Sequence, residues 1–230
     1  EVDSVLYTRA GLEMGVAASK TFTAQIALLY LIALKLAQVR ETLSEEEISS
    51  LVAEVQLLPE KIAQFLQDAD DGVHPIEDIA ERHFDKPFFL YLGRNIGLPI
   101  CLEGALKLKE ISYIPTEAYS AGEMKHGPIA LLDSETPVVC IATDSHVYDK
   151  VVSNIQETRA RGAQVIAIAT DGNEDIQHHA DDVIYVPKTN EYLQAVLAVL
   201  PLQLLAYRIA RLRGLNVDQP RNLAKTVTVE

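Results

Sequence analysis

The sequence predicts an α/β protein in which helices cover both faces of a parallel sheet. Short, continuously apolar runs of the kind that form buried strands alternate with longer helical stretches through the second half of the chain. The strands are expected at 88–92, 137–142, 165–169 and 183–186, and the helices at 96–114, 147–161 and 191–213. Parallel sheets bind ligands beyond the carboxyl ends of their strands, so a site is expected at that edge.

The first third of the chain is expected to be mainly helical. A short strand is predicted at 5–7, followed by a helix at 17–40 whose apolar residues surround its middle, which is typical of a helix buried on most sides. The next helix should begin after Ser44, because Ser44 and Glu47 have the spacing of a capping box. This helix should run to about residue 68, with a break at Pro59. Residues 68–75 are predicted to form an acidic linker.

Composition narrows the class of protein. Among 230 residues, 33 are acidic and 20 are Lys or Arg, giving a net charge of −13. This balance argues against nucleic acid or an anionic membrane as the main partner. Cys101 and Cys140 are too few for a disulfide framework or a thiolate metal site, so both are expected as buried thiols. The longest apolar run, 24–34, is too short to span a bilayer, and no signal sequence opens the chain, so a cytoplasmic protein is expected.

An internal comparison suggests a repeat. With a shift of 178 residues (183 − 5), Val5 falls on Val183 and Glu13 on Glu191. Both segments read as a strand, a short loop with a Glu and a long apolar helix. Two interpretations remain open: chance likeness of two αβ units, or a chain that starts in the last unit of a first copy and continues through a complete second copy.

Three charged residues on the 96–114 helix are candidates for proton transfer. Glu103, Lys107 and Glu110 are spaced four and three apart, so they share one helical face. A solvated stripe of charges is one interpretation. The other is a partly dry cleft in which a carboxylate acts as a base.

Two polar segments could also contribute to a site. The loop at 116–128 is long and Gly-rich and carries His126, which either titrates near neutral pH for a function or is incidental. The tail at 216–230 is either frayed or packs across a cleft. In the second case Lys225 would deliver an amine able to form a Schiff base with a carbonyl substrate.

Three segments together, 103–112, 123–128 and 218–230, resemble the glutamine–fructose-6-phosphate aminotransferases, a family of enzymes with sugar isomerase (SIS) domains. The resemblance covers essentially the whole chain. It implies a flavodoxin-like, three-layer αβα SIS fold with extra N-terminal helices. It also implies that residues 1–72 form the end of a first SIS subdomain plus linking helices, that 73–217 form a complete second SIS subdomain, and that 218–230 form a C-terminal active-site tail.

The resemblance implies roles for individual residues. Glu110 matches the base that moves a proton between C1 and C2, and Lys225 matches the lysine that forms a Schiff base with open-chain fructose 6-phosphate. His126 matches a ring-opening histidine given to the neighbouring subunit, and Lys107 matches a lysine close to the substrate. Backbone contacts to the sugar fall on Val16 and Ala224. The resemblance implies a sugar-phosphate substrate, a homodimer, ammonia from glutamine as the nitrogen source, and neither a cofactor nor a metal.

The sequence also departs from the family pattern. Ala18 stands where the family commonly has Ser, which removes one hydroxyl contact, and Pro115 replaces a common His. The glutaminase and the phosphate loops of the first SIS subdomain are missing, so residues 1–230 alone are expected to be inactive. Two further functions stay open: a non-catalytic SIS module that binds sugar phosphate or regulates, and an interaction role for the face exposed without the first subdomain.

Overall fold

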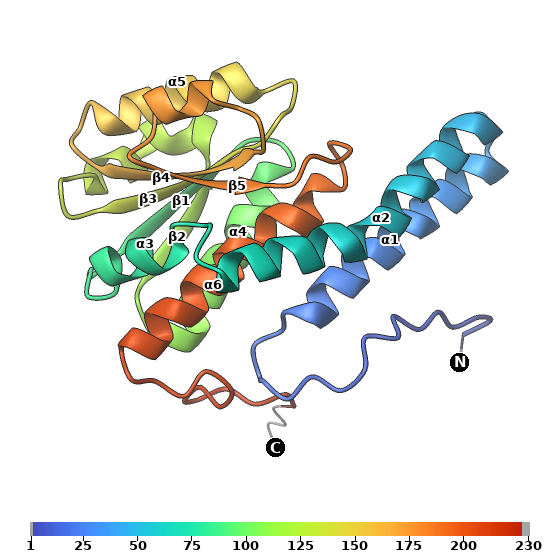
Figure 1. The fold of residues 1–230 in the computed structure, drawn as a ribbon, viewed down its shortest axis with the longest axis horizontal. Coiled ribbons are helices and arrows are strands. Elements are labelled where there is room, and N and C mark those ends of the chain that lie inside the picture. The colour runs from blue at the N-terminus through green and yellow to red at the C-terminus, as the bar shows by residue number, and fades with distance from the viewer. Residues whose placement is uncertain (1, 227–230) are drawn as a thin grey trace.

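The computed structural model describes residues 2–226. In it, a five-stranded parallel sheet lies between two layers of helices (Figure 1). The strands are β1 Phe89–Gly93, β2 Thr116–Ser120, β3 Pro137–Ala142, β4 Gln164–Thr170 and β5 Asp182–Val186. All neighbours pair in parallel, in the order β2-β1-β3-β4-β5. This is the flavodoxin-like order, so the predicted fold class is confirmed.

The two faces of the sheet carry different helices (Figure 1). On one face lie α3 Ile76–His83, α4 Gly97–Ser112 and α6 Gln194–Leu212; on the other lie α5 Tyr148–Arg159 and the 3₁₀ helix η1 Ala121–His126. Two shorter 3₁₀ turns, η2 Pro128–Leu131 and η3 Asp175–His178, complete the connections. Gly104 lets α4 approach α6 closely, because a Cβ there would lie 2.5 Å from the Leu202 Cδ1 atom. Close packing on α6 therefore fixes the position of α4.

Two long helices, α1 Lys20–Val39 and α2 Glu45–Asp70, extend from one side of the αβα unit (Figure 1). Leu34 is the buried residue of α1, whereas Leu29 and Leu36 are 61% and 56% exposed. The prediction that this helix is buried on most sides is therefore wrong in the described chain, because α1 packs mainly along α2 and against one side of α6. By length and composition α1 and α6 could each cross a membrane, but α6 is a core helix of this fold, and core helices pass the same test.

Helix α2 is continuous, so the predicted break at Pro59 is wrong. Proline removes one backbone hydrogen bond within a helix. The buried side chains Leu58 and Phe65 hold the helix on both sides of that gap. The capping box at its start is confirmed: the Glu47 N–H donates to the Ser44 Oγ atom (3.2 Å), and the Ser44 N–H donates to the Glu47 carboxylate (2.8 Å).

Three other expectations fail locally. Residues 5–7 form no strand in the described structure, because no neighbouring strand pairs with them and their side chains are 58–71% exposed. The segment expected to be a loop at 116–128 contains the edge strand β2 and η1, since β1 offers β2 a backbone to pair with. Helix α3 follows directly on the acidic linker, where the sequence predicts no helix. Cys101 and Cys140 are buried thiols, as expected.

One buried group should make stability depend on pH. His83 is 1% exposed, and its ring meets Phe89 edge-on. Burial, helped by the charge of Arg82, lowers the pKa of His83. An unfolded histidine binds a proton below about pH 6.5 that the folded state excludes, so the free energy of unfolding should fall as pH decreases from 7 towards 5. Urea unfolding at pH 7, 6 and 5 should show a smaller decrease for His83→Gln. The exposed His178→Gln is the control, and equal decreases in all three proteins would contradict the expectation.

Candidate active site

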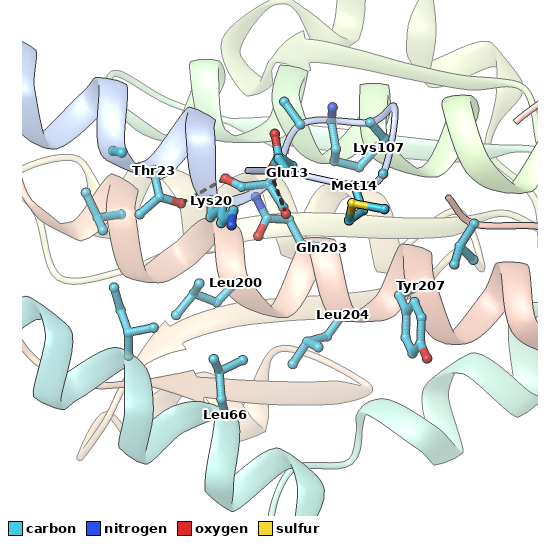
Figure 2. Close-up of a pocket in the computed structure, with 18 of the residues that line it drawn as sticks. Glu13, Met14, Lys20, Thr23, Leu66, Lys107, Leu200, Gln203, Leu204 and Tyr207 are labelled. Carbon is cyan, nitrogen blue, oxygen red and sulfur yellow. Dashed lines mark hydrogen bonds between the residues drawn. The ribbon is translucent and has the colours of Figure 1, made fainter. Parts of the chain in front are cut away.

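A cavity of about 870 Å³ lies where α1, α2, α4 and α6 meet the segment before α1 (Figure 2). Its wall is largely apolar, with Leu66 from α2 and Leu200 and Leu204 from α6. Glu13 and Lys107 supply charge at one end of the cavity, as Figure 2 shows. A large apolar cavity with a few convergent polar groups is the usual form of a small-molecule site.

The charged residues predicted on α4 form a cluster. The Lys107 Nζ atom lies 2.7 Å from the Glu110 Oε2 atom and 3.4 Å from the Glu103 Oε1 atom. The side chains of Lys107, Glu110 and Glu103 are only 6%, 21% and 12% exposed, respectively. The Glu103 Oε1 and Glu110 Oε2 atoms are buried, and both face the Lys107 ammonium. Charge attraction therefore holds the cluster, and the interpretation of a fully solvated stripe is wrong.

Burial raises the pKa of Glu103, and the Lys107 ammonium offsets only part of this effect. The two carboxylates therefore compete for one ammonium in a partly dry environment. Only Lys107 of the three lines the cavity directly, and it thus connects Glu110 to the cavity. A carboxylate in such a setting can exchange a proton with a bound molecule.

The position of Glu110 corrects one expectation. A helix that follows a strand of a parallel sheet runs back along it, so α4 ends near the start of the strands. Thr116, six residues after Glu110, pairs with Phe89, the first residue of β1, and Lys109 shares a surface hollow with Pro115. The site therefore lies over the outer helical layer, towards the amino end of the sheet. The prediction that Glu110 lies beyond the carboxyl edge is wrong.

Lys225 reaches the cavity wall through Glu13. The Lys225 Nζ atom is 3.2 Å from the Glu13 Oε2 atom, and the lysine side chain is 46% exposed while that of Glu13 is 8% exposed. The same carboxylate accepts from the Thr21 hydroxyl (2.5 Å) and the Ser19 N–H (2.9 Å). Burial alone would raise the pKa of Glu13, but the hydrogen bonds from Thr21, Ser19 and Lys225 outweigh it and lower the pKa to about 2.

The rest of the tail is also attached to the body. The Val16 N–H donates to the Asp218 carbonyl oxygen (2.9 Å), and the Arg221 N–H donates to the Tyr113 hydroxyl (2.8 Å). The Arg221 guanidinium also lies 4.2 Å from the centre of the Tyr113 ring. The described part of the tail is therefore not frayed. Residues 227–230 of the predicted tail segment lie outside the described residues.

The two predicted backbone contacts to sugar differ in their surroundings. The Val16 N–H already binds the tail, and Ala224 is exposed beside Lys225. Ala18 lines the cavity, so the hydroxyl that the family commonly supplies there is missing from its wall.

His126 is not brought to this cavity. It is exposed at the end of η1, on the face of the sheet that carries α5. Its neighbours in η1 show this placement, because Met124 packs in the α5-side core and the Lys125 ammonium lies 2.7 Å from the Glu157 carboxylate of α5. The structure thus links Glu110 to the cavity through Lys107 and Lys225 through Glu13, and it leaves His126 outside.

Two residues of the cavity are not recognisable as candidates from the sequence. Glu13 stands out only through its match with Glu191 in the internal comparison. The same shift of 178 residues places Gln25 on Gln203, the second of these residues. The Gln203 Nε2 atom is buried at the cavity without a hydrogen-bond partner among the described residues. Within the same residues, no group of three or more His, Cys, Asp or Glu side chains is arranged to hold a metal ion.

Comparison with known proteins gives consistent similarities. The SIS domain model matches residues 89–213. The chain is 52% identical over 230 residues to a glutamine–fructose-6-phosphate aminotransferase [isomerizing] of Thermus thermophilus and 50% identical to that of Methanosarcina acetivorans. It is covered completely in both matches but spans only 37% of each relative. The C-terminal domain of glucosamine-fructose-6-phosphate aminotransferase from Francisella tularensis superposes with a TM-score of 0.83 at 35% identity, over 91% of this chain and 58% of that one.

Proposed function

Since the chain belongs to the SIS domain family, we propose that it is the isomerase portion of a glutamine–fructose-6-phosphate aminotransferase. Such an enzyme converts fructose 6-phosphate and ammonia from glutamine to glucosamine 6-phosphate. Identity of 52% along the entire chain to an enzyme of that name supports the proposal. Because the chain spans 37% of that relative, the remaining parts of the reaction, the glutaminase included, are assigned to other segments of the full-length enzyme.

One observation carries the proposal: a lysine amine and a carboxylate are each linked to the wall of the same cavity through one paired residue. Lys225 binds Glu13 on the cavity wall, and Glu110 binds Lys107 on the same wall. An amine that forms an imine with C2 of the open ketose makes the C1 hydrogen more acidic. A carboxylate nearby can then move that proton between C1 and C2. The two groups have complementary roles in a ketose–aldose rearrangement.

The environment of Glu110 suits proton transfer. Its side chain is 21% exposed, so its charge is poorly screened by water and interacts strongly with the Lys107 ammonium 2.7 Å away. Lys107 lines the cavity itself, so its contact with Glu110 links the carboxylate to the cavity.

A homodimer and a ring-opening role for His126 remain parts of this proposal. His126 lies on the opposite face of the sheet from the cavity, which suits a contribution to a neighbouring subunit's site. The exposed apolar side chains of α1, Leu29 and Leu36 among them, support packing of that helix against a further surface. The cytoplasmic location expected from the sequence also stays a prediction.

The second candidate is a non-catalytic SIS module that binds or senses sugar phosphate. The cavity and the fold suit both functions. The Lys225 amine favours the enzyme, because binding alone requires no amine held beside a buried carboxylate.

Borohydride trapping distinguishes the two. The full-length enzyme incubated with fructose 6-phosphate and borohydride should gain one reduced sugar adduct, and peptide mapping should place it on Lys225. Lys20 also lines the cavity and serves as the internal control, since its Nζ atom donates to the Leu12 carbonyl oxygen (2.7 Å). No adduct with substrate bound would favour the binding module, and an adduct on Lys20 instead would contradict the role assigned to Lys225.

A further inference from the structure

The carboxylate of Glu13 is held firmly at the start of α1. It accepts hydrogen bonds from the Ser19 N–H and Oγ and from the Thr21 N–H and Oγ1, at 2.5–3.4 Å. Ser19 is the N-cap residue of α1 and its own side chain caps no backbone N–H, so Glu13 takes over the capping role. The positive end of the helix also favours a negative charge there. Glu13 thus presents a fixed anion to the cavity (Figure 2).

This anion does not act as a base. Its pKa of about 2 lies far below neutral pH, so it remains ionised and takes up no proton in the working range. What it offers to Lys225, 3.2 Å away, is a constant negative charge. The role of Glu13 towards the lysine is therefore electrostatic and positional.

The nitrogen of Lys225 is positively charged before and after imine formation. The ammonium first loses one proton to water, and the neutral nitrogen then attacks C2. A nitrogen–carbon bond forms and one proton passes from the nitrogen to the C2 oxygen. The first proton then returns from water to the same oxygen, and the C2–oxygen bond breaks to release water. In sum, ammonium and ketone give a protonated imine and water, with one positive charge on each side. A fixed anion beside this nitrogen holds the lysine at the cavity wall before the reaction. It then balances the charge of the protonated imine, the form that accepts electrons when the C1 proton is removed.

We propose, resting on the proposed function, that Glu13 is a positioning residue for Lys225. It holds the lysine nitrogen at the cavity wall and is the counter-ion of the protonated imine that this nitrogen forms with the sugar.

Glu13→Gln in the full-length enzyme tests this, because the amide keeps the size and one acceptor oxygen but loses the charge. The rate of borohydride trapping of fructose 6-phosphate on Lys225 should fall about fivefold, roughly 1 kcal/mol, as fits a half-exposed ion pair. Affinity for a hexitol 6-phosphate, which has no carbonyl group, should change by less than about twofold. A trapping rate equal to or above that of the unmodified enzyme would overturn the inference.

A matched control separates this role from helix capping. Glu47→Gln makes the same change in the capping box of α2, where the carboxylate contacts Ser44 and no lysine among the described residues. It should leave trapping unchanged, and an equal loss in both variants would overturn the inference. Glu13→Asp keeps the negative charge and an acceptor for the N–H groups at the start of α1. This variant provides a test if Glu13→Gln folds poorly. It should trap faster than Glu13→Gln, and equal loss in the two would show that charge is not the cause.

The experiment also separates this inference from the proposed function. If the unmodified enzyme forms no adduct on Lys225, the proposed function fails and the inference fails with it. If the unmodified enzyme forms the adduct and Glu13→Gln forms it equally fast, the inference alone fails.

Discussion

Glu110→Gln in the full-length enzyme should lower the rate of glucosamine 6-phosphate formation by about 10²–10⁴-fold, the usual contribution of a general base. The amide retains the shape of the side chain, which is about one-fifth exposed next to Lys107. It cannot accept the C1 proton. The loss should therefore appear in kcat, and exchange of the C1 hydrogen with solvent deuterium should fall by the same factor.

Two comparisons make this result specific to proton transfer. Trapping of the imine on Lys225 should survive in Glu110→Gln, because the amine and the carbonyl are unchanged. Glu103→Gln removes the other carboxylate beside Lys107 and should reduce the rate much less, since Glu103 pairs with Lys107 at the longer distance. Equal losses in both variants would mean that the charge of the pair, rather than proton transfer by Glu110, is what the reaction needs.

The αβα core was predictable because each of its signals is local. Strands such as β3 and β4 are continuous apolar runs, and continuous runs that alternate with helices allow few other folds. The capping box at Ser44 was predictable for the same reason, since its two partners are three residues apart.

The errors arise where distant parts of the chain decide the structure. Strand β2 has a mixed polar sequence and exists because β1 lies beside it. Residues 5–7 have strand-forming side chains but no neighbouring strand in the described structure. Pro59 breaks no helix because tertiary packing around Leu58 and Phe65 outweighs the lost hydrogen bond. In each case the presence or absence of a partner remote in sequence outweighs local preference.

The site shows the same division. Glu103, Lys107 and Glu110 were recognisable as a group because one helix carries them. The pairing of Glu13 with Lys225 joins residues 212 positions apart, and no local pattern reports it. The location of the site also escaped prediction, because its groups come from outer helices and the tail rather than from strand ends. The resemblance to a known family identified Lys225 as a candidate, and the structure identified Glu13 as its ion-pair partner.

Lys107→Met should cause the largest loss of stability of any single change at this site. The side chain is 6% exposed, and removing its ammonium leaves Glu103 and Glu110 as two partly buried carboxylates on one helical face without their counter-charge. Removal of one partner from a buried charge pair costs about 3–5 kcal/mol, and the partial exposure of Glu110 places the expected loss near the lower value, about 3 kcal/mol. Urea unfolding at pH 8 measures it.

The dependence of that loss on pH identifies charge as its cause. Burial already raises the pKa of Glu103, and removal of Lys107 takes away the charge that opposes this effect. A carboxyl group with a folded-state pKa above its unfolded value binds more protons when folded, so stability falls as pH rises through that interval. The loss in Lys107→Met should therefore be larger at pH 8 than at pH 5. Lys109→Met, an exposed change on the same helix, should alter stability little at either pH. A loss in Lys107→Met that is independent of pH would assign Lys107 to packing and remove it from the charged cluster that holds Glu110 at the cavity.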